Sequence, residues 1–354
     1  MSRPAARPQK FVSLEVARFL AALAVALEHL STAIPGMRLG PAPLAPMPAP
    51  AAVLFFFTLS GFVIFTAHHQ DAGQPARLPR YAWRRFCRIF PLYWLSLLPM
   101  LAVLWPGCTA PYLVKIFTLD PFTAPSLAEL NPPAWTLRSE ILFYIIFGFS
   151  LLPVARRVLL PAWGLALAAA WYHALRGWGG PETLLPFLPG GVSSHLLALT
   201  NIFFLAGLGA GWVFSRWQPR ARILWPLLGL SALVLLLLLH LDGGGTQYAT
   251  GPLLPFTAAA FAAVILLLAA LERRKSLRLN PRWAVLGAMS YPLYLLHSAA
   301  GFVFSADFFF RPADRAHFAP WPTFCLMLAM ALLASWLAAT MFDAPLQRLA
   351  RRIL

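Results

Sequence analysis

Apolar stretches of about 20 residues recur along the chain from residue 11 to residue 342, separated by short polar or proline-rich segments. An α-helix needs about 20 consecutive apolar residues to cross a bilayer. The pattern therefore predicts ten membrane-spanning helices, at residues 11–34, 50–68, 89–106, 136–153, 157–175, 193–214, 221–240, 250–271, 284–304 and 321–342. The predicted fold class is an all-α polytopic membrane protein, in which one transmembrane domain covers residues 1–354 and no soluble domain is fused to it.

Composition supports the membrane prediction. Of the 354 residues, 60% are hydrophobic and only 11% are charged, which is too little polar material to cover the core of a soluble protein. A secreted enzyme, a DNA-binding domain and a disordered chain are thereby excluded. The basic start of the chain precedes an apolar stretch that is too long for a signal peptide and contains Glu15 and Arg18, so we expect it to remain as the first span.

Basic residues are distributed unequally between the two sides of the predicted membrane domain. The formal net charge is +16, which in a soluble protein would suggest nucleic acid as a partner. Here, 21 of the Lys and Arg residues flank the spans on the side of the two termini, and 5 lie on the opposite side. The positive-inside rule therefore predicts that both termini are cytoplasmic, and the charge is explained by topology without nucleic acid.

The connecting segments give three further expectations. Residues 35–50 contain six prolines and are predicted to be extended, whereas residues 107–135 are predicted to form a re-entrant or interfacial lid. Gly207 and Gly211 form a small-xxx-small pair that favours close helix packing. The three cysteines are scattered without a metal-binding spacing, and no metal site is predicted.

Charged residues inside a span are costly in hydrocarbon, and the first span has several of them. Arg18 and His29 are eleven residues apart, which places them within about 20° of the same helix face and about 16 Å apart along the axis. Glu15 precedes Arg18 by three residues, so a purely structural ion pair between them is one interpretation. A polar stripe for a ligand is the other.

Three ionisable residues on three different spans are predicted to lie at a similar depth. His29 lies about 27 Å from the cytoplasmic start of its span, His297 lies about 21 Å from the start of its own, and Glu140 lies about 6 Å below the outer start of its span. The three side chains thus share the outer third of the bilayer, where they could supply a general base, a partner acid and a polar contact. A histidine that merely packs in the core is the alternative for His29.

A basic segment, RYAWRRFCRIFPLYW, precedes the third span and contains Arg80, Arg84, Arg85 and Arg88 at helical spacing. One interpretation is an amphipathic anchor on anionic lipid headgroups. The other is an arginine fork for a ligand that carries phosphate.

Six short motifs resemble, in order, those of the acyltransferase-3 family of membrane acyltransferases. They are LEVARFLAALAVALEHL with its Arg-x10-His pair, FFFTLSGFVIF, RRFCRIFPLYW, PPAWTLRSEILFY, SYPLYLLH and FDAPLQR, in which Asp343 stands where Glu is usual. The resemblance covers essentially the whole chain. It implies transfer of an acyl group, commonly acetyl, from cytoplasmic acyl-CoA to a hydroxyl of an envelope polysaccharide or lipid-linked saccharide outside a bacterial inner membrane.

The resemblance also implies roles for individual residues. Arg18, Arg84, Arg85 and Arg88 would bind acyl-CoA, which is the donor substrate, and no bound cofactor is expected. His29 would be the general base, with Glu28 or Glu140 fixing its tautomer, and a transient acyl-histidine remains open. The further polar candidates for contact with substrate are Ser60, Tyr144, Ser290, Tyr294 and His297.

Two other function classes use the same features. A secondary transporter would employ His29, Glu140 and His297 as a proton relay. A polytopic glycosyltransferase would need an acid in the first outer loop, and residues 35–50 contain none. Binding of labelled acetyl-CoA would distinguish the acyltransferase from both.

Overall fold

The computed structural model describes residues 10–34, 37, 49–104, 108–120, 130–185, 187–188, 190–241, 251–305 and 319–353, and its regular structure there is entirely helical. The long helices are α1 (Val12–Thr32), α2 (Ala49–His68), α3 (Leu78–Leu104), α5 (Ala134–Phe149), α6 (Ala155–Leu175), α9 (Asn201–Arg216), α10 (Ala221–Leu241), α11 (Leu254–Arg273), α12 (Ala284–Ser305) and α14 (Pro320–Leu337). Short helices are α4 (Ala110–Thr118), α7 (Pro181–Leu184), α8 (Gly190–Leu196) and α15 (Ala344–Ile353). The all-α prediction is confirmed.

Within the described residues, six helical segments are long and apolar enough to cross a membrane, which makes the protein a polytopic membrane protein. They are Ala49–His68, Arg157–Leu175, Gly191–Arg216, Ala221–Leu241, Leu254–Arg273 and Pro320–Ile353. The other four predicted spans coincide with α1, α3, α5 and α12, which hold most of the polar side chains of the site described below. The count of ten spans and the cytoplasmic location of the termini stay predictions.

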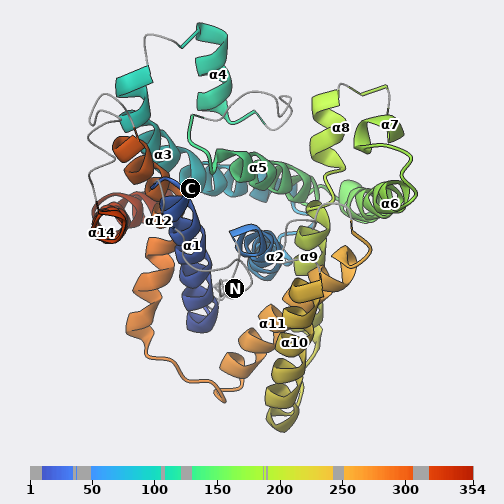
Figure 1. Ribbon diagram of the computed structural model, residues 1–354. Coiled ribbons are helices and arrows are strands. Elements are labelled where there is room, and N and C mark those ends of the chain that lie inside the picture. Colours follow the sequence, from blue (N-terminus) through green and yellow to red (C-terminus); the bar gives the residue numbers. More distant parts are fainter. Residues whose placement is uncertain are drawn as a thin grey trace.

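The helices form a bundle in which α1 and α2 lie near the centre, with α12 beside α1 (Figure 1). Helix α1 packs against α12, and α2 packs against α9, which in turn contacts α11. Helix α10 packs on α11 at the periphery and exposes apolar side chains such as Leu230 and Leu236, as expected of a helix that faces lipid.

Helices α2 and α9 approach closely because small residues lie at their crossing. A Cβ atom added at Gly207 would overlap the backbone oxygen of Thr58, and one at Gly211 would lie 2.9 Å from Cβ of Phe65. Only glycine permits this backbone contact. The predicted small-xxx-small pair is confirmed.

The first turn of α1 is fixed by an acid from a distant helix. Glu272, near the end of α11, accepts hydrogen bonds from the backbone N–H groups of Val12 at 2.7 Å and Ser13 at 2.9 Å. The hydroxyl of Ser13 donates to the same carboxylate at 2.7 Å. The carboxylate thus satisfies donors that have no partner inside the helix, and its charge complements the helix dipole.

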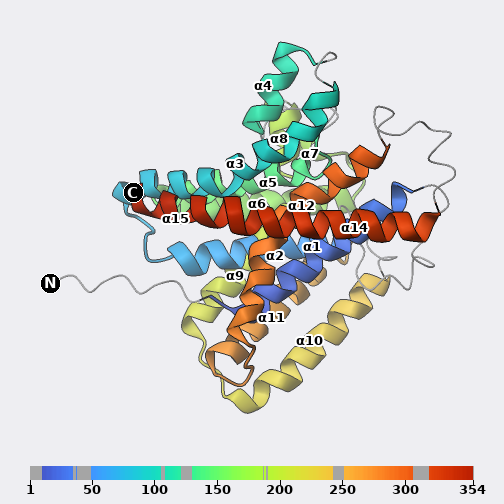
Figure 2. The same ribbon diagram turned by 90° about the vertical axis from the view of Figure 1, so that its left-hand side faces the viewer.

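The C-terminal helix changes its geometry in the middle. Helix α14 continues through the π-helical segment η5 (Ala338–Asp343) into α15, and Figure 2 shows the three as one long rod on the side of the bundle. The wider turn ends at Asp343, which is buried. A π-helical turn of this kind often marks a functional site.

Two sequence expectations concern segments that are only partly described. Residues 35–36 and 38–48, which include most of the predicted extended loop, lie outside the described residues, as do residues 107 and 121–129 of the predicted lid. The rest of that predicted lid contains α4, which is attached to α3 because Trp94 Nε1 donates to the carbonyl oxygen of Phe117 at 2.9 Å.

The predicted span at 193–214 is divided. Helix α8 ends at Leu196 and α9 begins at Asn201. The side-chain amide of Asn201 donates to the carbonyl oxygens of His195 at 2.8 Å and Leu196 at 3.1 Å. These bonds satisfy the last carbonyls of α8 and stabilise the break.

Candidate active site

A cavity of about 550 Å³ lies between α1, α2, α3, α5, α12 and the η5–α15 segment. Along α12 it extends from Ala284 to Tyr294, ten residues or about 15 Å of helix. Its basic lining residues are Lys10, Arg18, Arg85, Arg88, Arg348 and Arg351, and its acidic ones are Glu15, Glu140 and Asp343. Lys10, Arg348 and Arg351 are exposed, so one end of the cavity has a basic mouth beside the first turn of α1 and helix α15.

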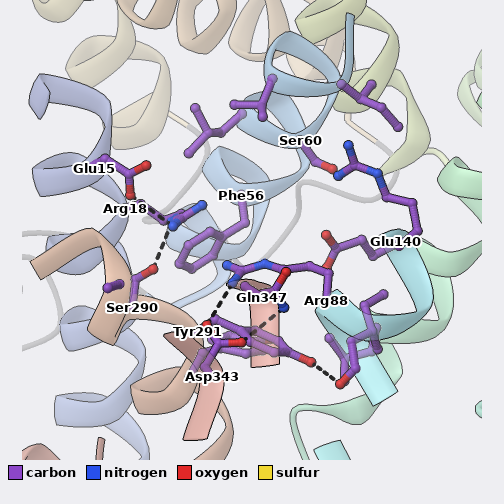
Figure 3. Close-up of a pocket in the computed structure, with 18 of the residues that line it drawn as sticks. Glu15, Arg18, Phe56, Ser60, Arg88, Glu140, Ser290, Tyr291, Asp343 and Gln347 are labelled. Carbon is purple, nitrogen blue, oxygen red and sulfur yellow. Dashed lines mark hydrogen bonds and ion pairs between the residues drawn. The ribbon is translucent and has the colours of Figure 1, made fainter. Parts of the chain in front are cut away.

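Arg18 is held in the cavity by contacts from two helices (Figure 3). Its Nε donates to Ser290 Oγ at 2.8 Å, and its Nη2 donates to Glu15 Oε2 at 2.9 Å and to the carbonyl oxygen of Gly287 at 2.9 Å. A Cβ atom at Gly287 would overlap the Glu15 carboxylate, so glycine makes room for this ion pair. The structural pairing of Glu15 with Arg18 is confirmed, and both residues also line the cavity.

Arg88 is oriented by the C-terminal segment. Its Nη1 lies 3.2 Å from Asp343 Oδ2, and its guanidinium carbon lies 4.9 Å from the centre of the Tyr291 ring. Figure 3 shows Arg88, Tyr291 and Asp343 together at one wall of the cavity. The π-helical turn places Asp343 in position for this ion pair.

Arg85 is oriented by a second chain of contacts. Its Nη2 lies 2.8 Å from His68 Nε2, and His68 Nδ1 lies 3.0 Å from Asp71 Oδ2. Because a guanidinium only donates, His68 Nε2 accepts and Nδ1–H donates to the carboxylate. Tyr144 is also in contact, since its ring centre is 5.0 Å from the guanidinium carbon.

The two other arginines of the basic segment are placed differently. Arg84, which was predicted to bind acyl-CoA, and Arg80 are not among the residues that line the cavity, whereas Arg85 and Arg88 are. Of these four arginines, the cavity is therefore lined by Arg85 and Arg88.

Glu140 lines the cavity on the α5 side. The hydroxyl of Tyr144 donates to Glu140 Oε1, one helical turn away, and both residues lie in the lining. Ser60, from α2, also lines the cavity (Figure 3). The structure therefore brings Glu140 to the arginines of the cavity, and not to the two histidines with which it was predicted to share a depth.

His29 and His297 are in direct contact. His29 Nδ1 lies 3.0 Å from His297 Nε2, and His297 Nδ1 lies 2.9 Å from the carbonyl oxygen of Leu293. His297 is fully buried, whereas His29 is exposed at the surface. Neither histidine lines the cavity.

Tyr294 connects the cavity with the histidine pair. It lines the inner end of the cavity, and its ring contacts that of His297 with a centroid distance of 6.2 Å. Its hydroxyl is hydrogen-bonded to Thr136 at 2.8 Å, and Phe56 packs against its ring. Tyr294 therefore contacts both the basic cavity and the partly exposed histidine pair.

Glu28 has a different partner from the one predicted. Its carboxylate accepts a 2.7 Å hydrogen bond from the backbone N–H of Ala49, the first residue of α2. The residue whose side chain contacts His29 Nδ1 is His297. Glu28 thus stabilises the start of a helix in this structure.

Sequence reasoning missed several groups at the mouth and wall of the cavity, among them Arg348, Arg351 and Gln347. Their signal was available, because Arg348 and Arg351 are three residues apart on the amphipathic helix α15 and therefore share a face. Among the described residues, no cluster of His, Cys, Asp and Glu suited to a metal ion is found.

Comparison with known proteins adds the chemical class. The acyltransferase domain family model, Acyl_transf_3, matches residues 11–340. The exopolysaccharide production protein ExoZ of Rhizobium meliloti (strain 1021) is 29% identical over 266 residues, which cover 71% of this chain and 76% of ExoZ. The acyltransferase MdmB of Streptomyces mycarofaciens is 27% identical over 340 residues, covering 85% of this chain and 81% of MdmB. No solved structure matches this chain.

Proposed function

Because the chain belongs to the acyltransferase-3 family, we propose that it transfers an acyl group, in the first instance acetyl, from acyl-CoA to a hydroxyl of an envelope glycan or lipid-linked saccharide. The name of ExoZ, an exopolysaccharide production protein, supports a glycan acceptor. We place the protein in the cytoplasmic membrane of a bacterial cell, with donor and acceptor reaching it from opposite sides. The transporter alternative is not retained, since the family is one of acyltransferases.

The proposal depends mainly on one arrangement, in which Tyr294 lines the basic cavity and also contacts His297 of the histidine pair. The guanidinium groups of Arg85 and Arg88 are suited to hold the phosphates of acyl-CoA, because planar donors form paired hydrogen bonds with phosphate oxygens. Lys10, Arg348 and Arg351 add positive charge at the mouth. The pantetheine arm would then extend along α12 toward Tyr294.

In the proposed reaction, His29 acts as general base. It removes the proton of the acceptor hydroxyl while the hydroxyl oxygen attacks the thioester carbonyl. The bond between the carbonyl carbon and sulfur breaks, and the CoA thiolate takes up the proton that His29 received. An ester on the acceptor and free CoA are the products.

The experiment uses membranes from cells that express the protein. They are incubated with radiolabelled acetyl-CoA, and label is counted in the polysaccharide and lipid-linked saccharide fractions. His29→Ala should lower the transfer rate by about 100-fold or more, the usual cost of losing a general base, with acetyl-CoA binding unchanged. His240→Ala, which changes an exposed histidine at the end of α10, is the matched control and should transfer at the wild-type rate. A His29→Ala protein that labels the acceptor normally would contradict the proposal.

A further inference from the structure

We propose that His297 is a positioning residue that fixes the tautomer of His29, so that Nε2 of His29 is the basic atom. This inference rests on the proposed role of His29 as general base. It assigns to His297, which does not line the cavity, a function that acts through another residue.

The tautomer of His297 follows from its hydrogen bond to the backbone carbonyl of Leu293. The carbonyl oxygen of Leu293 lies 2.9 Å from His297 Nδ1 and can only accept a hydrogen bond. His297 Nδ1 therefore carries the hydrogen. In the neutral imidazole, which suits a fully buried side chain, Nε2 is then an acceptor with a lone pair.

The contact between the two histidines then fixes which nitrogen of His29 carries the hydrogen. His29 Nδ1 lies 3.0 Å from His297 Nε2, and an acceptor there requires a hydrogen on His29 Nδ1. A neutral His29 with hydrogen on Nδ1 has its lone pair on Nε2. The tautomer of a functional histidine is set in this way by the hydrogen bond that its other nitrogen makes.

The geometry of His297 is itself fixed from several directions. The ring is fully buried and contacts the ring of Tyr294, whose hydroxyl is bonded to Thr136. One residue further along α12, Ser298 donates to Asn131 Oδ1 at 2.6 Å, and Asn131 Nδ2 donates to Ser96 Oγ at 2.8 Å. These bonds attach this turn of α12 to α3. His297 is therefore held rigidly enough to impose one ring orientation on His29.

Three substitutions at position 297 separate positioning from packing. His297→Gln can place its amide oxygen toward His29 and so keep the acceptor. His297→Asn is too short to reach His29 but can still donate to the carbonyl of Leu293. His297→Leu removes both polar contacts. The matched control is Ser335→Ala, which breaks a buried hydrogen bond to the carbonyl oxygen of Ala331 on α14 and leaves the contacts of His297 described above in place.

The measured quantities are kcat for acetyl transfer, KM for acetyl-CoA and acetyl-CoA affinity. His297→Asn and His297→Leu should lower kcat by about 10- to 100-fold, as found for the partner behind a functional histidine, with KM for acetyl-CoA unchanged. His297→Gln should recover most of that loss, and Ser335→Ala should keep the wild-type kcat. An Asn variant as active as wild type, or a Gln variant as impaired as Leu, would overturn the proposal.

A spectroscopic measurement tests the tautomer without altering His297. Nitrogen-15 spectra of histidine-labelled wild-type protein are compared with those of His29→Gln, whose missing signals belong to His29. We expect a protonated Nδ1 and an unprotonated Nε2, and the reverse pattern would refute the inference even if every variant at 297 misfolds. If His29→Ala transfers acetyl normally, the proposed function fails. If His29 is essential but His297→Asn is fully active, only the present inference fails.

Discussion

The side-chain amide of Gln347 donates a 2.9 Å hydrogen bond to the carbonyl oxygen of Cys87, 260 residues earlier in the chain. In an uninterrupted helix this carbonyl would accept from the N–H of residue 91, but that residue is Pro91 and has no N–H. Gln347 supplies the missing donor. Asp343, one turn before Gln347, pairs with Arg88. The closing motif is therefore bonded to α3 at two neighbouring points of the cavity wall, one of which replaces the N–H that Pro91 lacks.

The hydrogen bond from Gln347 to Cys87 predicts a non-additive effect of two substitutions. Gln347→Leu should destabilise the protein by about 1–3 kcal/mol, the cost of leaving a buried acceptor without its partner. In a Pro91→Ala background the restored N–H can satisfy Cys87, so the same change should cost clearly less. Unfolding by denaturant in detergent, measured for the four proteins of the cycle, gives the coupling. Equal costs in both backgrounds would mean that the amide does not replace the proline's missing donor.

The crossing of α2 and α9 predicts a sharp difference between two glycines on one helix. Gly207→Ala would place a methyl group into the backbone of Thr58, whereas a Cβ at Gly209 meets nothing within 4 Å. We expect Gly207→Ala to cost about 1–3 kcal/mol or more, as overpacking does, and Gly209→Ala to be neutral or slightly stabilising. Thermal unfolding in detergent compares the two. Similar melting temperatures for both variants would show that this crossing is not tightly packed.

Much of the helical framework could be predicted from the sequence, because an apolar run long enough to cross a bilayer has few alternatives to a helix. The predicted spans 221–240 and 284–304 coincide closely with α10 and α12. The break before Asn201 and the π-helical turn at Asp343 were not predicted. Both depend on partners far away or on side-chain bonds to backbone, which hydrophobic periodicity does not report.

The site was predicted in part for a similar reason. Counting residues along a helix gives the depth of a side chain but not the direction in which the helix faces. This counting was sufficient for His29 and His297, which are in contact, and for Glu15 and Arg18, which are paired at i,i+3 spacing. It was insufficient for Glu140, which turns toward the arginines of the cavity.

The unequal distribution of basic residues predicts the orientation of the chain in the membrane. With 21 Lys and Arg on the side of the termini and 5 on the other, reporter fusions after residue 45 and after residue 280 should report outside and inside, respectively. Alkaline phosphatase and a fluorescent protein are suitable reporters, since each is active on one side only. The opposite pattern would place the basic mouth of the cavity outside the cell, away from acyl-CoA.

The basic segment of α3 predicts which arginines recognise the donor. Arg85 and Arg88 line the cavity, whereas Arg80 and Arg84 belong to the same segment and do not. If the segment were only a lipid anchor, its total charge would decide binding to the membrane, and exchange of any of the four arginines for lysine should change little. A phosphate site depends on the planar guanidinium with several donors, which lysine lacks. We therefore expect Arg85→Lys and Arg88→Lys to weaken acetyl-CoA binding by about tenfold or more, the loss of one charge-assisted hydrogen bond.

Arg80→Lys and Arg84→Lys are the matched controls, because they make the same chemical change on the same helix with the net charge unchanged. Equilibrium binding of labelled acetyl-CoA to the four purified variants measures the effect. Competition with 3′-phosphoadenosine 5′-diphosphate, the nucleotide end of CoA without its pantetheine arm, shows whether the lost affinity belongs to that end. If all four variants bind acetyl-CoA as wild type does, the arginines serve the membrane surface, and the phosphates must be held by Lys10, Arg348 and Arg351 at the mouth.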